Sequence, residues 1–413
     1  MNHPDHCALS DPSEARGRRP VTVVYVDVLE VGHAADHLAF YIEVCRQAGL
    51  DMAAFVTPAL WQRGCNLVVD QYHGAQRVGG PATQDFSAAG VRRLLDDVVA
   101  YCKGRLDVFI YFPWLDPFLD ELVRRRGFGL VGAALPVPFA GVFFRDDFNY
   151  WRQIAFRPRR LFKALARLAR LRLTSGGTCR EIVTFNPEWR AKLSARVTML
   201  PDALSALDRS VEPAELAALS PPANADRTRF LVFGDLGPRK GILQAIEGFK
   251  RLSDEALARS QLRVLGKFPD PSYRDAVLSG LEQLQGRGLK IEIKNERQSD
   301  AELHSALLDC HFLVATYIDH FGSSHVLGLS ARYGRPVIGQ HTSQMAAEIQ
   351  RFGLGVTVNP RNPDDVARGL RDLLSGGDMA GEGMRHYLSN RSPDRARDIA
   401  SQIFLRLADA VQA

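Results

Sequence analysis

The feature that most constrains the fold is an alternation of strand-like and helical segments that begins near residue 21. Residues 21–28 form a continuous run rich in valine, and the helical pattern after it ends at Gly49. The same alternation continues with strand candidates at 52–57, 66–70, 106–112, 129–134 and 139–144, and with helical candidates near 88–103 and 115–126. Continuous apolar strands separated by helices are typical of a parallel sheet that is covered on both faces.

The alternation starts again after a proline-containing stretch near 201–227, which is typical of a boundary between domains. In this second half we predict strands at 229–234, 262–266 and 289–293, and helices at 241–252 and 272–285. We therefore predict an α/β fold with two doubly wound, Rossmann-like domains that face each other across a cleft. The predicted parts are a disordered leader at 1–19, domains at 20–203 and 228–392, a linker at 204–227 and a C-terminal helix at 393–413.

The composition fits two domains of an ordinary globular protein. The chain has 413 residues, of which 46% are hydrophobic and 24% are charged, and this length exceeds one typical core. Its net charge of +5 is too small to indicate nucleic-acid binding. None of the six cysteines belongs to a C-x-x-C pair, and no apolar run approaches the roughly 18 residues that span a bilayer. Because the N-terminus carries no signal-peptide pattern, we expect a cytoplasmic protein.

A turn of small residues at 319–325 lies between an apolar strand candidate at 312–315 and an apolar helical segment at 326–331. This order places backbone N–H groups at the start of a helix, where the helix dipole favours an anion. The segment continues through a Gly-x-Pro turn at 334–336 into another short apolar strand. The turn thus belongs to an α/β unit, and a diphosphate is its expected ligand.

A second turn, 234–241, follows the strand candidate at 229–234 and contains Arg239 and Lys240 immediately before Gly241. At the start of a helix, the ammonium group of Lys240 can reach a diphosphate, and the guanidinium of Arg239 can add a bidentate contact. A solvated pair of cations at a helix start is the alternative explanation. The turn at 319–325 further along the chain favours the phosphate site.

Together with the 334–338 segment, the two turns resemble the donor domain of glycosyltransferases that have the glycosyltransferase-B fold. Within that group the chain is most similar to the retaining family four, also called group 1, and the resemblance covers about 229–375. It implies transfer of a sugar from a UDP- or GDP-type nucleotide diphosphate, with retention of anomeric configuration. It also implies that no metal or other cofactor is needed, because cationic side chains and helix dipoles stabilise the leaving diphosphate.

The resemblance also implies roles for individual residues. Binding of the donor diphosphate is expected at Arg239, Lys240, Gly322, Ser323 and Ser324. Asp319, which stands near the first of the family's paired glutamates, and His325, at the start of the helix, are candidate catalytic residues. His33 is a third candidate because of its place in the turn after the first strand, and not because of the resemblance. The carboxylate of Glu348 is expected to accept hydrogen bonds from the ribose hydroxyls of the donor nucleoside. Packing at a helix start is the alternative for His325, and a solvated helix position is the alternative for Glu348.

The sequence departs from the family pattern at two positions. Asp235 stands where an arginine is usual, and Leu327 stands where a second glutamate is usual. Both departures bear on catalysis, because the family uses those side chains to hold the donor.

The acceptor side is expected in the first domain. Gly32, His33 and His37 follow the first strand, and Trp114 and Asp116 follow the strand candidate at 106–112. In a parallel sheet both segments lie at the edge that faces the cleft. An aromatic ring beside a carboxylate suits a sugar or another ring-bearing acceptor. Ordinary turn and packing residues are the alternative.

Residues 157–173, from Arg157 to Leu173, contain seven basic residues and no acidic residue, and Leu161, Leu165 and Leu168 fall on one helical face. Such a helix can rest on anionic lipid at the inner face of a membrane, where each cation contributes on the order of 1 kcal/mol. The alternative is a domain helix that packs its leucines on the sheet and solvates its arginines. Nucleic acid is not expected, because no aromatic stacking platform accompanies the charge.

We therefore expect a glycosyltransferase that uses a nucleotide sugar as co-substrate and a sugar, lipid-linked or small-molecule acceptor. Two other functions stay open. One is a non-catalytic subunit of the same fold that binds a nucleotide sugar or a partner, which Asp235 and Leu327 favour. The other is a sugar-nucleotide epimerase, which would need a carboxylate or histidine pair that the sequence does not show.

Overall fold

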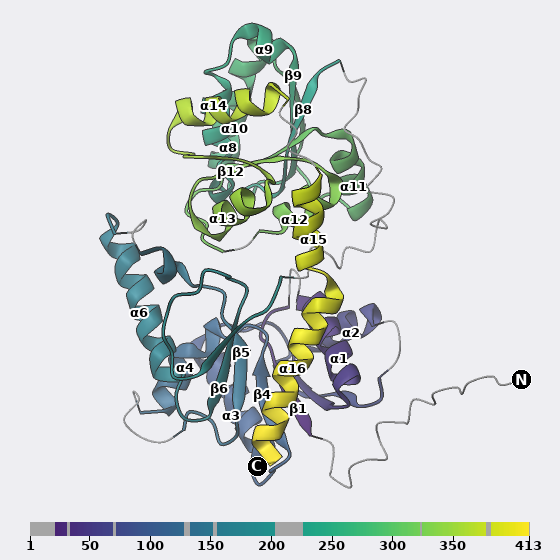
Figure 1. The fold of residues 1–413 in the computed structure, drawn as a ribbon, viewed down its shortest axis with the longest axis vertical. Coiled ribbons are helices and arrows are strands. Elements are labelled where there is room, and N and C mark those ends of the chain that lie inside the picture. The colour runs from purple at the N-terminus through teal and green to yellow at the C-terminus, as the bar shows by residue number, and fades with distance from the viewer. Residues whose placement is uncertain are drawn as a thin grey trace, which may run out of the picture.

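The computed structural model describes residues 21–30, 34–68, 72–127, 133–151, 155–202, 226–322, 324–376 and 381–412. Its strands form two parallel sheets, each with helices and a hydrophobic cluster on both faces (Figure 1). This arrangement confirms the predicted α/β architecture with two doubly wound units. The predicted leader and nearly all of the predicted linker lie outside the described residues.

The first sheet has the strand order β3-β2-β1-β4-β5-β6-β7. Its strands are β1 (Thr22–Val26), β2 (Asp51–Phe55), β3 (Ala75–Gly79), β4 (Val108–Phe112), β5 (Phe139–Val142), β6 (Cys179–Thr184) and β7 (Arg196–Met199). In the register of the central strands, Tyr25 lies opposite Ala54 on one side and Tyr111 on the other. All residues of β1 and β4 are buried, as expected for apolar strands covered on both faces.

The helical elements of the first unit are α1 (Ala34–Ala48), α2 (Pro58–Leu67), α3 (Ala88–Cys102), η2 (Asp116–Phe118), α4 (Leu119–Arg125), η3 (Asp147–Tyr150) and α6 (Pro158–Thr174). The strand predicted at 66–70 is wrong at its start, because α2 continues to Leu67. The hydroxyl of Thr57 caps this helix by accepting a hydrogen bond from the Leu60 amide, and Pro58 occupies its first turn.

The second sheet has the order β10-β9-β8-β11-β12-β13. Its strands are β8 (Thr228–Asp235), β9 (Ser260–Lys267), β10 (Lys290–Lys294), β11 (Phe312–Ala315), β12 (Val337–Gln340) and β13 (Gly355–Val358). Its helical elements are η5 (Pro238–Lys240), α8 (Ile242–Phe249), α9 (Asp254–Ala258), α10 (Pro271–Gly286), α11 (Asp300–Asp309), α12 (His325–Tyr333), α13 (Ser343–Phe352), α14 (Pro363–Leu374) and α15 (Glu382–Asn390). The chain order reverses between β8 and β11, the type of position at which open α/β sheets bind ligands.

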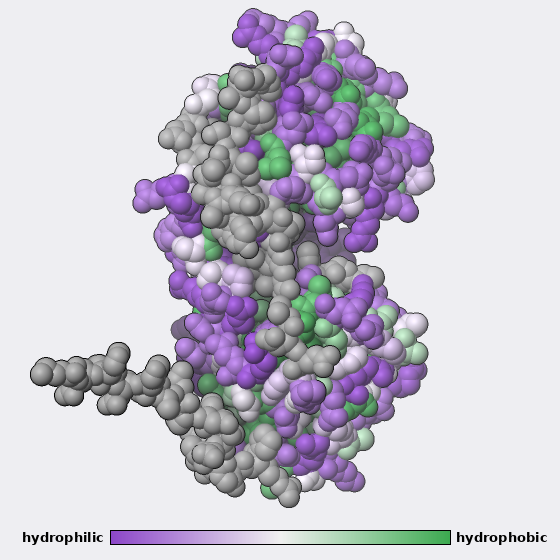
Figure 2. Space-filling view, turned by 90° about the vertical axis from the view of Figure 1, so that its right-hand side faces the viewer, coloured by the Kyte–Doolittle hydropathy of each residue, from purple (hydrophilic) through white to green (hydrophobic). Residues whose placement is uncertain are grey.

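The last helix, α16 (Pro393–Gln412), returns from the second unit and packs on the first, where the C-terminus lies (Figure 1). The ring of Phe404 in this helix stacks on Tyr41 of α1 at 5.8 Å and meets Tyr111 of β4 edge-on at 4.8 Å. Seen from the side, the molecule has two lobes with a mainly hydrophilic surface and a hollow at the waist between them (Figure 2). The chain therefore passes back from the second unit to the first at the connection between α15 and α16 (Figure 1).

Candidate functional site

The turn after β8 depends on two glycines with left-handed backbone conformations. Gly234 has a φ of 97° and Gly241 a φ of 68°. A Cβ atom on Gly241 would lie 1.8 Å from the carbonyl oxygen of Thr316, so only glycine allows the turn to approach the end of β11. This approach places Arg239 and Lys240, in η5, beside the loop that follows β11.

The two turns that the sequence singles out are in direct contact. The Lys240 ammonium donates a hydrogen bond to the Tyr317 hydroxyl at 3.0 Å, and the Ser324 hydroxyl lies 3.4 Å from the same oxygen. The amide of Ile318 donates to the Arg239 carbonyl at 2.8 Å, and the Arg239 guanidinium lies 3.3 Å from Nδ1 of His320. Of the residues predicted to bind the diphosphate, Arg239, Lys240 and Ser324 are thus brought to one edge of the second sheet.

Lys240 and Arg239 form no ion pair with any residue that the structure describes. Besides its hydrogen bond, the Lys240 ammonium lies 4.9 Å from the centre of the Tyr317 ring, and the Arg239 guanidinium lies 5.5 Å from it. Aromatic faces and a phenol offset little of a positive charge compared with a carboxylate. This edge therefore has two cations whose charge an anionic ligand can neutralise.

The structure describes some of the other predicted residues and leaves others undescribed. Gly322 lines the cavity between the domains, and His325 is the first residue of α12. Ser323, Gly32 and His33 lie outside the described residues. Leu327, which stands where the family usually has a glutamate, lies in α12 and is fully buried in a hydrophobic core cluster of the second unit. The roles assigned to these residues stay predictions.

Asp319 has a left-handed backbone, with a φ of 58°, and is surrounded by arginines. It forms ion pairs with Arg157, with Arg160 at 3.4 Å and with Arg361 at 3.0 Å. Partial burial pushes the pKa of Asp319 up, but the hydrogen bond from Arg157 and the three positive charges outweigh burial and hold the pKa below its usual range. Because Arg157 and Arg160 belong to the first unit and Arg361 to the second, Asp319 links the two across the cleft.

Glu348 is placed differently from the expectation of an open ribose site. It is 2% exposed, and its carboxylate is paired with Arg391 just before α16. It also accepts hydrogen bonds from Gln344 at 2.9 Å and from the Tyr387 hydroxyl at 3.4 Å. Burial raises the pKa of Glu348, and the Arg391 charge opposes the rise. Its ribose role stays a prediction, and that role would require this buried pair to open.

The acceptor-side residues of the first unit converge on the loop after β5. Asp116 accepts hydrogen bonds from the amides of Phe144 at 2.9 Å and Arg145 at 3.0 Å. His37 meets the Phe144 ring edge-on at 6.4 Å, and the Arg145 guanidinium lies 6.0 Å from the Trp114 ring. Desolvation raises the pKa of Asp116 to about 6, and the two amide hydrogen bonds limit the rise. These residues position one loop, although they are distant in sequence.

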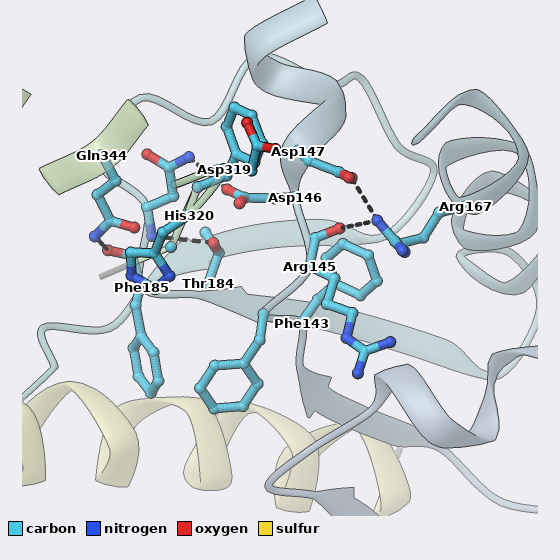
Figure 3. A pocket seen from close by; sticks show the side chains of 14 residues that line it. Phe143, Arg145, Asp146, Asp147, Arg167, Thr184, Phe185, Asp319, His320 and Gln344 are labelled. Atoms are coloured by element: carbon cyan, nitrogen blue, oxygen red, sulfur yellow. Dashed lines mark hydrogen bonds and ion pairs between the residues drawn. The ribbon is translucent and has the colours of Figure 1, made fainter. Parts of the chain in front are cut away.

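That loop forms one wall of a cavity of about 440 Å³ between the two units (Figure 3). The lining from the first unit is Phe143, Phe144, Arg145, Asp146, Asp147, Arg167, Thr184, Phe185 and Asn186. The lining from the second unit is Asp319, His320, Phe321, Gly322 and Gln344. Apart from Arg167 of α6, these residues lie at or after the C-terminal ends of β5, β6 and β11 or begin α13, so the ligand-binding edges of both sheets face the same space.

Several polar residues of this cavity were not predicted from the sequence, among them Asp146, Asn186 and Gln344. Asp146 is buried, accepts a hydrogen bond from Asn149 at 3.1 Å and another from Asn186, and has its pKa raised to about 6 by burial. The amide of Gln344 donates to the Phe185 carbonyl at 2.8 Å and so joins the two units directly. Asp146 and Asn186 could have been identified from the sequence, because each is an acidic or amide residue within four positions of the end of an apolar strand.

Asp27 is a further buried carboxylate at the cleft edge of the first sheet, immediately after β1. It is 3% exposed and accepts a hydrogen bond from the Leu29 amide at 2.9 Å. Burial raises its pKa to about 7, and the amide hydrogen bonds oppose this rise. A carboxyl group that titrates near neutral pH at a ligand-binding edge is a candidate for proton transfer.

Among the described residues, no group of three or more His, Cys, Asp and Glu side chains is arranged to hold a metal ion. Within the same residues, every helix is too short or too polar to cross a membrane.

No family model matches the sequence, and no curated protein matches it significantly. Solved structures do match the fold. A UDP-forming α,α-trehalose-phosphate synthase from Burkholderia xenovorans matches with a TM-score of 0.62 at 12% identity, over 96% of this chain and 100% of that one. A sucrose-phosphate synthase from Thermosynechococcus elongatus matches with a TM-score of 0.62 at 15% identity, over 95% and 100%.

A third match is Anabaena HepE, described in complex with UDP and glucose, with a TM-score of 0.60 at 14% identity over 94% of this chain and 100% of that one. At these identities the likeness concerns the fold, which extends over nearly the whole of each chain. The chain therefore has the glycosyltransferase-B fold, as its two turns and its repeated α/β alternation predicted.

Proposed function

We propose that this chain is a glycosyltransferase that transfers a sugar from a nucleotide diphosphate to an acceptor bound in the first unit. The observation that carries the proposal is the pair of cations, Arg239 and Lys240, that lack carboxylate partners among the described residues. They lie where the two predicted turns meet, at the cleft edge of the second sheet. An anionic ligand at this edge would restore the charge balance, and a diphosphate has the matching size and charge.

In the proposed reaction the chain stabilises the leaving group. Lys240, Arg239 and the start of α12 bind the diphosphate and neutralise the charge that grows on it while the sugar becomes oxocarbenium-like. These groups support a metal-independent reaction, and the family resemblance supports retention of anomeric configuration. The Tyr317 hydroxyl holds the Lys240 ammonium in place before the donor binds. The catalytic candidates of this proposal are Asp319 and His325, together with His33, which lies outside the described residues.

The acceptor is proposed to enter the cavity between the units from the side of Trp114 and Arg145. Relatives with the same fold support a sugar as acceptor. HepE is described with UDP and glucose, and a trehalose-phosphate synthase from Burkholderia xenovorans is described with glucose-6-phosphate. We also propose a cytoplasmic setting, with peripheral contact at the inner membrane face through α6.

A non-catalytic nucleotide-sugar-binding protein is the second candidate, and one observation favours it. Asp319, the expected catalytic carboxylate, is held by Arg157, Arg160 and Arg361, while position 327 offers a buried leucine instead of a glutamate. In that case the cleft would bind the donor without cleaving it.

The test is the release of nucleoside diphosphate from a panel of UDP- and GDP-sugars, measured with simple sugars, sugar phosphates and lipid-linked sugars as acceptors. Release that survives a chelator, with a product of the donor's anomeric configuration, would support the whole proposal. Tight binding of a nucleotide sugar without turnover on any acceptor would identify the non-catalytic protein. Absence of both binding and turnover would exclude the two candidates together.

A further inference from the structure

Helix α6 has a different outer surface from the one that its sequence suggests. Leu161 and Leu168 pack on the core of the first unit, so the predicted leucine face does not point outward. The exposed apolar residues are instead Phe162, which is 74% exposed, Leu165, which is 50% exposed, and Phe156 just before the helix, which is 94% exposed. Exposing such large apolar side chains to water is unfavourable in free energy unless another surface covers them.

The cations of the same segment divide into two sets. Four of its seven basic residues form ion pairs within the chain: Arg157 and Arg160 with Asp319, Arg167 with Asp147, and Arg170 with Asp120. Three others, Arg159, Lys163 and Arg172, form no ion pair with any described residue. Arg159, Lys163 and Arg172 are exposed, as are Phe162 and Leu165 on the same helix. We call Phe156, Arg159, Phe162, Lys163, Leu165 and Arg172 the outer strip.

We propose that the outer strip docks on an anionic lipid bilayer. Phenylalanine and leucine side chains can enter the boundary between headgroups and acyl chains, while the flanking ammonium and guanidinium groups contact lipid phosphates. The segment contains no acidic residue that would repel such a surface. A protein partner would not require three uncompensated cations around two phenylalanines, whereas an anionic membrane accounts for both features.

The inner side of α6 faces the cavity, so a membrane bound to the outer strip would lie close to that cavity. Arg160 lies over the ring of Phe321 at 5.4 Å and is paired with Asp319, and Arg167 is paired with Asp147 in the cavity wall. The helix is about 10–12 Å across with its side chains, so docking would bring the cavity within that distance of the bilayer. If the chain is the transferase proposed above, its acceptor is therefore a lipid-linked molecule embedded in the membrane.

The test is co-sedimentation of the full chain with vesicles of phosphatidylcholine alone or mixed with phosphatidylglycerol. We expect binding only to the mixed vesicles and a marked loss of binding at high salt. Replacing Arg159, Lys163 and Arg172 together by glutamine should lower the partition coefficient about a hundredfold, since each cation contributes about fivefold. The Phe156→Ser and Phe162→Ser pair should lower it by at least about tenfold.

Matched controls come from other surfaces of the first unit. Leu106 is 86% exposed and lies outside the outer strip, so Leu106→Ser should not change vesicle binding. Arg63→Gln and Lys103→Gln remove exposed cations from α2 and from the end of α3, and should have little effect. All variants should keep the wild-type melting temperature, because they are on the surface.

Three results would overturn the proposal. The first is equal binding of the wild type and the glutamine variant to both kinds of vesicle. The second is lipid-free self-association that the serine variants abolish, which would identify a second copy of the chain as the occupant. The third is binding of nucleic acid in preference to vesicles. Nucleoside diphosphate binding without lipid tests the transferase proposal separately, because no residue of the outer strip belongs to the donor site.

Discussion

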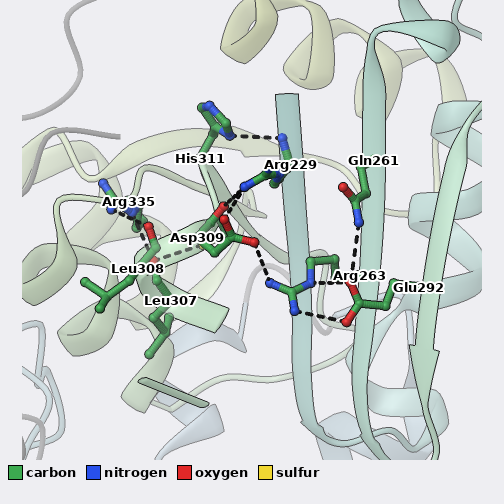
Figure 4. Close-up of polar contacts among 10 residues, drawn as sticks. Arg229, Gln261, Arg263, Glu292, Leu307, Leu308, Asp309, His311 and Arg335 are labelled. Atoms are coloured by element: carbon green, nitrogen blue, oxygen red, sulfur yellow. Dashed lines mark hydrogen bonds and ion pairs between the residues drawn. The ribbon is translucent and has the colours of Figure 1, made fainter. Parts of the chain in front are cut away.

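Arg229 in β8 and Arg263 in β9 are both ion-paired, whereas Arg239 and Lys240 at the opposite edge of the same sheet form no ion pair with a described residue. Arg263 binds Glu292 at 2.8 Å and Asp309 at 3.2 Å, and Asp309 also pairs with Arg229 (Figure 4). Deeper in the same unit, Arg335 donates to carbonyls at the end of α11. The cations at one edge are thus neutralised by the chain's own acceptors, whereas those at the other edge lack a carboxylate partner among the described residues, as expected of the proposed anion site.

The difference shows what each set of cations contributes. Paired arginines near the start of the sheet stabilise the fold, and their removal leaves buried or half-buried carboxylates without partners. The cations at the cleft edge contribute little to stability in the absence of a ligand. Substitutions at the two edges should therefore separate stability from ligand binding.

The largest effect is expected inside the same unit, where Glu348 and Arg391 form a buried pair. Replacing Glu348 with alanine should lower the free energy of unfolding by about 3–5 kcal/mol, because the Arg391 guanidinium is left without its carboxylate. Chemical denaturation measures this loss, and the Glu348→Leu, Arg391→Met double variant should recover part of it. If Glu348→Ala instead kept full stability and lost nucleotide binding, Glu348 would be a ribose ligand after all.

Arg263→Ala should lower the free energy of unfolding by about 2 kcal/mol, since two carboxylates lose a shared partner that is only 14% exposed. Affinity for nucleoside diphosphate should stay at the wild-type value at temperatures where the variant is folded. Arg274→Ala is the matched control, because Arg274 pairs with a neighbouring aspartate on the surface and should change stability by less than about 0.5 kcal/mol. A shift in donor affinity for Arg263→Ala would break the contrast between the edges.

Lys240→Ala should weaken nucleoside diphosphate binding about tenfold or more, equivalent to about 1.4 kcal/mol. The melting temperature should change little, because the ammonium group has no carboxylate partner in the described parts of the chain. Calorimetric titration measures the affinity, and Lys240→Arg should retain part of it. Lys290→Ala, an exposed cation at the start of β10, serves as the control and should bind like the wild type.

The smallest effect is expected in the first sheet, where the buried carboxyl group of Asp27 has no cationic partner among the residues that the structure describes. Its pKa, raised from 3.8 to about 7, means that the folded state holds a proton that the unfolded state has released. Stability should therefore fall as the pH rises, by about 1 kcal/mol between about pH 6 and pH 8. In Asp27→Asn this part of the pH dependence should disappear. An unchanged pH profile in the variant would mean that Asp27 is ionised in the folded protein.

The sequence predicted the architecture well because strands such as β1 and β4 are continuous apolar runs bounded by turn residues. Strands β3, β6, β7 and β13 were not predicted, since each has at most six residues and an apolar pattern that polar residues or glycine interrupt. The strand expected at 66–70 failed because the capped helix α2 extends into it. Local pattern was thus sufficient for the central strands and insufficient at and near the edges of the sheets.

In the candidate site, local sequence was sufficient to identify the two turns, because each consists of contiguous residues with a distinctive order. It could not identify the partners that come from elsewhere in the chain. Asp319 meets Arg157, 162 positions away, and Glu348 meets Arg391, 43 positions away. Such pairings follow from the packing of the two units, which no short pattern encodes.

The central claim, that the cleft edge of the second sheet binds a diphosphate, is tested most directly by hydrogen–deuterium exchange with UDP and GDP. We predict that at least one of them slows exchange in 234–241 and in 316–322 together, and that Lys240→Ala removes both effects. Slowed exchange confined to other segments, or no change with either nucleotide at saturating concentration, would contradict the claim.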